Sequence, residues 1–233
     1  MKRIAIITAR SGSKGLKDKN IMDLRGRPLI DYTIRAALDS GCFDEVMVST
    51  DSQLYADISI KCGASVPFLR SAETSGDTAG SWDVVREVLR NYEAMGQVFD
   101  QAVLLQPTSP LRTAEDITGA FRRMEEVGAE NMISVVEVEH PIQWCVKASE
   151  DLSLTELAAS PYWEMRRQDL PKHYRVNGAI YIVNAKKMMD PNYAYMSDKC
   201  YGYIMEQEKS VDIDTITDFC AVEAILNHMA AQE

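Results

Sequence analysis

A cluster of cations and small residues near the N-terminus is the first feature of this sequence that could do chemistry. Residues 8–20 read TARSGSKGLKDKN and follow an apolar run at 4–7. The formal net charge of the chain is −10, yet this loop carries four cations, at Arg10, Lys14, Lys17 and Lys19. Positive charge against an acidic background favours a polyanionic ligand. Glycine-rich backbone and the hydroxyls of Ser11 and Ser13 provide phosphate donors. We predict a phosphate-binding loop; the alternative is a solvated basic turn.

A pair of carboxylates near the C-terminus could hold a metal ion. The segment KSVDIDT, residues 209–215, places Asp212 and Asp214 on either side of Ile213. In a strand, residues two apart point to the same face, so we expect the carboxylates to converge while Ile213 packs inward. Two hard oxygen ligands suit Mg²⁺ carried with a triphosphate. Alternatively, Asp214 caps the final helix.

Two other loops are candidates for ligand recognition. LLQPTSPLR, residues 104–112, contains two prolines that fix its backbone, and we expect its polar side chains to project at the pocket rim: Gln106, Thr108, Ser109 and Arg112. The alternative is a plain connection in which Thr113 caps the next helix. GDTAGS, residues 76–81, precedes a helix, and we expect it to present backbone N–H groups or Asp77 to a ligand. The alternative is that it only caps the helix.

Alternating apolar segments indicate the elements that position these loops. Short runs predict strands at 3–8, 45–50, 64–69, 102–106, 132–138, 177–184 and 202–205. Amphipathic patterns predict helices at 28–40, 54–62, 81–95, 114–127 and 215–229, the last with an apolar stripe in the core. This order is typical of an α/β fold with a mostly parallel sheet and helices on both faces. Ligands bind such sheets at the carboxyl ends of the strands.

The alternation is interrupted between residues 140 and 175. This stretch contains Trp144 and Trp163 among prolines and paired arginines, without a clear period. We predict an α/β domain of residues 1–139 and 176–233, with residues 140–175 inserted as an arm. Aromatic residues without a core of their own pack against something else, so we expect the arm to form a homodimer contact. A subdomain folded on its own chain is the alternative.

Composition excludes several classes of function. The chain has 35 acidic residues against 25 lysines and arginines, which argues against nucleic-acid binding. Five cysteines lie far apart without a CxxC pair, and three scattered histidines do not suit a zinc site. No apolar run approaches the roughly 18 residues of a membrane span, and the run at 4–7 is too short for a signal peptide. We expect reduced thiols, a cytoplasmic location and no membrane contact.

Four motifs in order resemble one enzyme family over essentially the whole chain. TARSGSKGLKDKN, QPTSPLR, RVNGAIYI and SVDIDT are similar to the motifs of acylneuraminate cytidylyltransferases, or CMP-sialic acid synthetases. The resemblance implies a Rossmann-like nucleotidyltransferase fold and a homodimer. It implies that CTP and a nine-carbon sugar acid give a CMP-sugar and pyrophosphate with Mg²⁺, by attack of the anomeric hydroxyl on the α-phosphate. Kdo synthetases resemble the chain less, because they continue RLPGKPL where this chain has GLKDKNI.

The resemblance also implies roles for individual residues. By motif position, the nucleotide contacts are Ala9, Arg10, Ser13, Lys19, Asn20 and Arg70, beside the candidate Asp77. Arg10, Lys19 and Asp214 are the implied catalytic residues, and Asp212 and Asp214 the implied metal ligands. We expect Lys19 at the pocket rim, where it contributes little to packing. The sugar contacts are Ser81, Gln106, Gln143, Tyr181 and, from the partner subunit, Arg167.

Gln143 bears on the identity of the sugar. It stands in HPIQW, where some sialate-using members have a lysine after the HP pair. A legionaminate, pseudaminate or Kdo type of acceptor therefore remains an alternative to a sialic acid. A nucleotide-binding module without turnover is a further alternative, which the paired carboxylates argue against.

Overall fold

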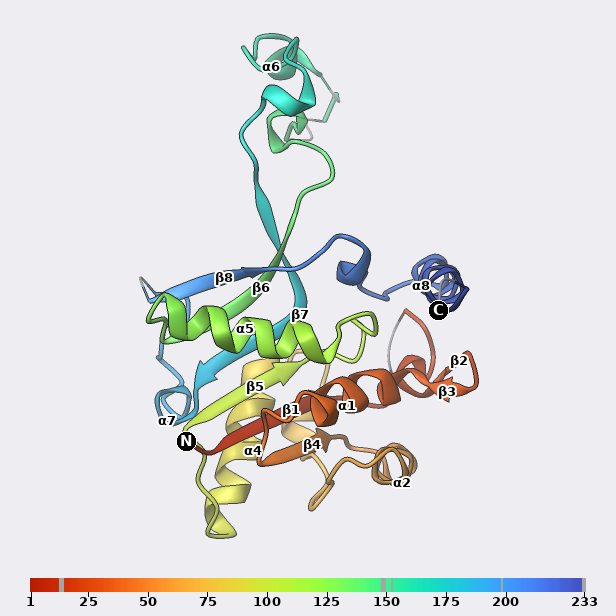
Figure 1. The fold of residues 1–233 in the computed structure, drawn as a ribbon, viewed down its shortest axis with the longest axis vertical. Helices are drawn as coiled ribbons and strands as arrows, with labels where there is room; N and C mark the ends of the chain where they lie inside the picture. Colours follow the sequence, from red (N-terminus) through yellow and green to blue (C-terminus); the bar gives the residue numbers. More distant parts are fainter. Residues whose placement is uncertain (13–14, 148–149, 152, 198, 232–233) are drawn as a thin grey trace.

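The predicted strands form one mixed sheet in the computed structural model, which describes residues 1–12, 15–147, 150–151, 153–197 and 199–231. Six strands within these residues follow the order β4-β1-β5-β7-β6-β8 (Figure 1). Their bounds are β1 Arg3–Thr8, β4 Glu45–Ser49, β5 Gln101–Leu105, β6 Asn131–Glu137, β7 Tyr174–Asn184 and β8 Cys200–Ile204. β1 runs parallel to β4 and β5, and β6 parallel to β8. β7 is antiparallel to both of its neighbours, so the sheet is mostly but not wholly parallel.

Helices cover both faces of the sheet, as the alternation predicted. One face packs against α1 (Leu29–Asp39), α5 (Ala114–Glu126) and part of α2 (Gln53–Lys61). The other packs against α4 (Ser81–Ala94) and α7 (Ala185–Met188). A strand buried on both faces requires continuous apolar sequence, and residues 4–7 of β1 are all fully buried. The α/β fold is therefore confirmed.

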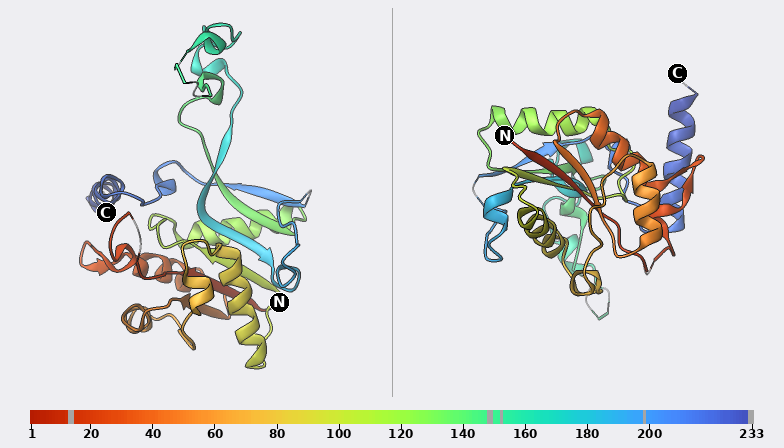
Figure 2. Two further views of the ribbon diagram at one scale, coloured as in Figure 1. Left: turned by 180° about the vertical axis from the view of Figure 1, so that it is seen from behind. Right: turned by 90° about the horizontal axis from the view of Figure 1, so that it is seen from below.

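Two predicted elements differ in the structure. Residues 64–69 form no strand beyond a single bridge from Ser65 to Met47, and the chain continues to α3 (Ala72–Ser75). Pro67 lies in this segment and has no N–H to donate to a sheet ladder. The stripe of α8 (Ile216–Ala230) is only partly core, because Phe219 and Val222 are buried whereas Ile216 is 54% exposed. α8 lies at the edge of the molecule (Figure 2) and packs on one side only, near the hairpin of β2 (Asp23–Leu24) and β3 (Arg27–Pro28).

The segment between β6 and β7 projects from the body of the molecule (Figure 1). Its described residues form short helices, η2 Ile142–Trp144, α6 Thr155–Ala158 and η3 Arg167–Asp169. Leu157 and Leu170 are buried, and Trp144 Nε1 donates to the Tyr162 carbonyl at 3.2 Å. Many of its apolar side chains are exposed: Ile142, Val146, Leu154, Tyr162, Trp163 and Met165. The projection therefore has only a small core of its own.

Two general features of the chain accompany this fold. Among the helices that the structure describes, none is long and apolar enough to cross a membrane. All five cysteines have free thiols in this structure.

Candidate active site

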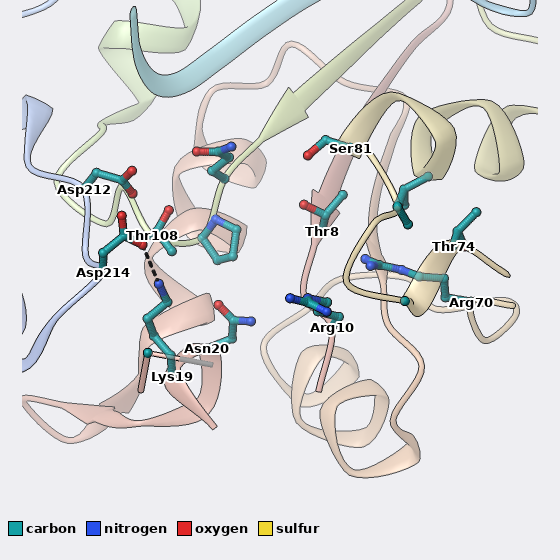
Figure 3. Close-up of a pocket in the computed structure, with 16 residues that line it drawn as sticks. Thr8, Arg10, Lys19, Asn20, Arg70, Thr74, Ser81, Thr108, Asp212 and Asp214 are labelled. Atoms are coloured by element: carbon teal, nitrogen blue, oxygen red, sulfur yellow. Dashed lines mark hydrogen bonds and ion pairs between the residues drawn. The ribbon is translucent and has the colours of Figure 1, made fainter. Parts of the chain in front are cut away.

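A pocket of about 550 Å³ lies beyond the carboxyl ends of β1 and β5. It brings together eight of the predicted site residues: Arg10, Lys19, Asn20, Arg70, Ser81, Gln106, Asp212 and Asp214. Figure 3 shows Lys19, Asp212 and Asp214 on one side, and Arg10 and Arg70 on the other. The pocket therefore has a mixed wall of carboxylates with one lysine, and an opposite wall with two arginines.

The opening loop is anchored to β4 and to the residues that follow it. The amide of Ala9, which is buried, donates to the Ser49 carbonyl at 3.0 Å and extends the β1–β4 pairing. The amide and hydroxyl of Ser11 donate to the two oxygens of Asp51, both at 2.7 Å. Burial would raise the pKa of Asp51, but the Ser11 hydrogen bonds outweigh it and lower that pKa. Ser11 therefore anchors the loop and is not the phosphate donor that we expected, while Ser13 and Lys14 lie outside the described residues.

Lys19 joins this loop to the acidic segment. Lys19 and Asn20 begin the short helix η1 (Lys19–Ile21), and both are buried. Lys19 Nζ donates to the Ile213 carbonyl and lies 3.1 Å from Asp214 Oδ1. The expectation of an exposed rim lysine with little packing is wrong, because only 9% of Lys19 is exposed.

Gly15 allows the loop to approach the acidic segment closely. A Cβ atom at this position would lie 2.8 Å from the backbone oxygen of Asp214. Backbone atoms cannot move aside as a flexible side chain can, so the contact requires glycine. Loop and acidic segment thus meet through both a glycine contact and the Lys19 ion pair.

The opposite wall of the pocket carries two arginines. Arg10 Nη1 forms an ion pair with Asp77 Oδ1 at 2.8 Å. Arg70 is 8% exposed, and its guanidinium donates to the Ser49 hydroxyl at 3.0 Å and the Ser49 carbonyl at 2.6 Å. Burial lowers the pKa of Arg70 to about 10, so it stays charged at neutral pH. Asp77 pairs with Arg10 and does not itself line the pocket, so its contact with a nucleotide stays a prediction.

The acidic pair lies in a loop, not in the strand that we expected. Residues 211–214 follow the short helix η4 (Glu208–Ser210) without regular structure. Ile213 is fully buried, as predicted, and its amide donates to the Thr108 carbonyl at 2.9 Å. Both carboxylates line the pocket. Thr215 caps α8, so the alternative that Asp214 is the helix cap is wrong.

The chemistry of Asp212 and Asp214 fits a divalent cation. Burial raises the pKa of Asp212, and the nearby Asp214 carboxylate adds to this effect. Asp212 Oδ1 is buried and has no hydrogen-bond partner among the described residues. The described residues contain no group of three or more metal-ligating side chains. Two carboxylates therefore suit Mg²⁺, which takes its remaining ligands from phosphate and water.

The turn after β5 holds Gln106 against β7. Gln106 and Thr108 line the pocket, but Ser109 and Arg112 are buried at 0% and 2% exposure and do not project as we expected. Arg112 Nη1 donates to the carbonyls of Gln106 and Ala179, which ties the turn to β7. The alternative that Thr113 caps the following helix is confirmed, since its hydroxyl accepts from the Asp116 amide.

The predicted sugar contacts fall into two groups. Ser81, the first residue of α4, and Gln106 line the pocket. Tyr181 packs edge-on against Trp82 at 5.9 Å between ring centroids and does not line it. Gln143 and Arg167 lie in the projection, where Arg167 borders a separate cavity of about 210 Å³. The structure therefore does not bring these last three residues to the pocket of their own chain.

Several lining residues were missed from the sequence. They include Thr8, Thr74 and Val84, whereas Gly76 and Ala79 lie in the segment 76–81 that the sequence had indicated. Thr8 was detectable, because it is a hydroxyl at the carboxyl end of a predicted strand. Thr74 belongs to the segment between residue 70 and α4, where the sequence gives no periodic signal.

Comparison with known proteins identifies the family. A family model described as cytidylyltransferase matches residues 4–229. The N-acylneuraminate cytidylyltransferase of Streptococcus agalactiae serotype V is 42% identical over 225 residues, which cover 95% of this chain and 52% of that protein. The chain thus spans about half the length of this relative. The CMP-N,N'-diacetyllegionaminic acid synthase of Legionella pneumophila is 36% identical over 227 residues, 97% of each chain.

A solved structure shows the same fold. A CMP:2-keto-3-deoxy-manno-octonic acid synthetase complexed with CTP superimposes with a TM-score of 0.73 at 16% identity, covering 98% of this chain and all of that chain. The family model and the relatives agree with the resemblance of the sequence motifs. The chain therefore belongs to the cytidylyltransferase family of nucleotidyltransferase enzymes.

Proposed function

We propose that this protein joins CTP to a nonulosonic acid, giving a CMP-sugar and pyrophosphate. The observation that carries the proposal is a single pocket with cations on both sides and two carboxylates, with Lys19 and Asp214 in an ion pair. Relatives named as N-acylneuraminate and N,N'-diacetyllegionaminic acid enzymes support an acceptor of this class. The relatives do not distinguish among the members of this class of acids, so a sialic, legionaminic or pseudaminic acid fits the proposal. A Kdo-type acid is the alternative acceptor, because the similar solved structure is a Kdo synthetase.

The two arginines and Lys19 suit a triphosphate. Arg10, Lys19 and Arg70 all line the pocket. A triphosphate carries several negative charges, and cations held in place by the protein neutralise them with little reorganisation. Arg10 exchanges Asp77 for phosphate when CTP binds. Asn20, Ala9 and Ser13 are the further proposed nucleotide contacts, Ala9 through the backbone.

The acidic pair serves the reacting centre. Asp212 and Asp214 would hold Mg²⁺, which supplies charge neutralisation at the phosphates when bound. Asp214 accepts the proton of the anomeric hydroxyl, whose oxygen forms a bond to the α-phosphorus. The bond between the α-phosphorus and the bridging oxygen breaks, and pyrophosphate leaves with the electron pair. The chain's main contribution is alignment of the hydroxyl and the phosphate.

The acceptor lies on the side of the pocket formed by Gln106 and Ser81. A planar, bidentate guanidinium suits its carboxylate, and Arg167 of the partner subunit would supply that group. Gln143 and Tyr181 are the remaining proposed contacts. This arrangement requires a homodimer, which the exposed apolar side chains of the projection support. We propose residues 140–175 as this dimerisation arm on a domain of residues 1–139 and 176–233.

A reducing compartment fits the cysteines. All five are free thiols, which is typical of the cytoplasm. A cytoplasmic enzyme would also meet CTP there.

Pyrophosphate release tests the proposed function. Release of pyrophosphate must require CTP, a nonulosonic acid and Mg²⁺ together. Omitting any one of the three must abolish the release. Calorimetry with CTP on the same preparation identifies the alternative of a nucleotide-binding module, which would bind CTP and release no pyrophosphate with any acid. Sedimentation mass tests the dimer, and a monomer at assay concentration would contradict the shared site.

A further inference from the structure

A bulge in β7 lies beside Asp212 of the acidic pair. In the β6–β7 ladder, Ile133 pairs with Tyr181 and Val135 pairs with Val176. Residues 177–180 of β7 therefore lie opposite Ser134 alone. Such a bulge re-aims side chains and is often found beside functional sites.

The bulge separates Gln106 from Asp212. Gly178 lies in it with a φ of 80°. A Cβ atom on Gly178 would lie 2.5 Å from Gln106 Oε1 and 4.0 Å from Asp212 Oδ2. The conformation of the bulge therefore affects both the acceptor side and the acidic side of the pocket.

Ser134 and Asn177 hold the bulge in shape. Both are buried, at 0% and 2% exposure. Ser134 Oγ donates to Asn177 Oδ1 at 2.6 Å and accepts from the Ile180 amide at 2.8 Å. Asn177 Oδ1 also accepts from the Ala179 amide at 3.3 Å. The acceptor half of the Asn177 carboxamide is thus fully occupied within the sheet.

The donor half of the same carboxamide reaches the acidic segment. Asn177 Nδ2 donates to Ser210 Oγ at 2.9 Å and lies 3.3 Å from Met205 Sδ. Ser210 Oγ in turn donates to the Glu206 carbonyl at 2.7 Å, which closes the turn that precedes Asp212. Only a carboxamide accepts and donates in this way, because a carboxylate has no hydrogen to donate.

We infer that Asn177 is a positioning residue which, through Ser210, fixes where Asp212 and Asp214 lie relative to Gln106. It does not line the pocket. The inference rests on the proposed role of the acidic pair in holding Mg²⁺. Residues that orient metal ligands without touching the metal also contribute to metal affinity. Their loss typically weakens metal binding by about 10- to 100-fold.

Asn131 offers a matched control for a purely structural role. It is also fully buried in the same sheet, and its Nδ2 donates to Tyr193 Oη at 2.7 Å and to the Tyr195 carbonyl at 2.9 Å. Its Oδ1 accepts from the Asn184 amide at 3.2 Å. The Asn131 side chain therefore makes three hydrogen bonds to nitrogen and oxygen atoms, as the Asn177 side chain does, but none of them is with the acidic segment.

The experiment compares Asn177→Ala and Ser210→Ala with Asn131→Ala in the full chain. Hydrogen exchange at the Ile213 amide, measured without nucleotide or metal, reports the position of the acidic segment. The Mg²⁺ concentration for half-maximal pyrophosphate release reports its function. Ser210→Ala removes the same hydrogen bond without altering β7, so it decides the matter if Asn177→Ala does not fold. Ser210→Thr keeps the hydroxyl and should restore both readouts.

We expect both test variants to speed exchange at Ile213 and to raise the Mg²⁺ requirement by about tenfold. Asn131→Ala should lower the melting temperature without either effect. Equal effects of Asn177→Ala and Asn131→Ala on both readouts would overturn the inference, as would unchanged exchange in Ser210→Ala. If the unmodified protein released no pyrophosphate, the proposed function would fail, and exchange at Ile213 would still decide the positioning role.

Discussion

The ammonium group of Lys19 lies 3.1 Å from the carboxylate of Asp214, and this ion pair joins two residues 195 positions apart in the chain. The same group donates to the Ile213 carbonyl. One buried side chain therefore holds the opening loop, residues 8–20, against the acidic segment. It contributes both to the charge of the pocket and to the stability of its walls.

Replacing Lys19 by alanine should lower turnover and stability together. We expect turnover to fall by about 100-fold or more, as when a preorganised charge-stabilising donor is removed. The Ile213 carbonyl loses its buried partner, so the free energy of unfolding should fall by about 1–3 kcal/mol. Steady-state kinetics and urea unfolding measure the two effects. Lys17→Ala is the control, because Lys17 is exposed and does not line the pocket. Full activity in a destabilised Lys19→Ala protein would assign the lysine a structural role only.

Gly15→Ala should separate the loop from the acidic segment. The added methyl group would lie 2.8 Å from the Asp214 carbonyl oxygen, so the backbone must move. We expect a large loss of activity with CTP at saturation. Gly76→Ala is the matched control, since Gly76 also lines the pocket and has open space around its Cβ position. Equal activities of the two variants would show that close approach at residue 15 is not needed.

Asp77→Asn should improve CTP binding if Arg10 exchanges partners. A partly exposed ion pair such as Arg10–Asp77 stabilises the nucleotide-free protein by roughly 0.2–1 kcal/mol. Binding of CTP must break this pair, so its removal should lower the KM for CTP by up to about fivefold. Arg10→Ala should raise the same KM. A higher KM in Asp77→Asn would instead indicate that Asp77 contacts the nucleotide directly.

Asp51 should make the opening loop sensitive to acid. Hydrogen bonds from Ser11 outweigh burial and lower the pKa of Asp51 in the folded protein. A carboxyl group whose pKa is lower in the folded than in the unfolded protein stabilises the fold at pH values above its unfolded pKa of roughly 4. This stabilisation is lost as the pH falls through the folded pKa.

Asp51→Asn should therefore destabilise the protein by about 1–3 kcal/mol at pH 7, with the difference shrinking at lower pH. Urea unfolding at pH 7 and pH 3 measures this. Asp57→Asn on α2 is the control, because Asp57 is exposed. A difference that stayed constant with pH would show that ionisation of Asp51 is not involved.

The local pattern of apolar residues was sufficient to predict most helices and strands. It was not sufficient to predict contacts between residues far apart in the sequence. β1 appeared as a buried strand because residues 4–7 are continuously apolar. Residues 64–69 are also largely apolar, yet Pro67 prevents regular pairing there. The apolar stripe of α8 suggested a core helix, but the period of a helix does not reveal whether a second layer covers it.

The candidate site shows the same division. Charge and spacing indicated a basic opening loop and the acidic pair, and the resemblance to the family singled out Arg10 and Lys19 within that loop. Burial of Lys19 and Arg112 was not predictable, since each depends on partners that only the fold brings near. The support of the acidic segment by Asn177 was hidden for the same reason.

Transfer of label from α-³²P-CTP to a sugar acid tests the central claim most directly. The protein would be incubated with Mg²⁺ and, separately, with N-acetylneuraminate, legionaminate, pseudaminate or Kdo. We predict a labelled CMP-sugar with at least one of the three nonulosonic acids, accompanied by an equal amount of pyrophosphate and lost in Asp214→Asn. CTP binding without labelled product from any of these acids, in a dimeric preparation with its pocket intact, would contradict the account.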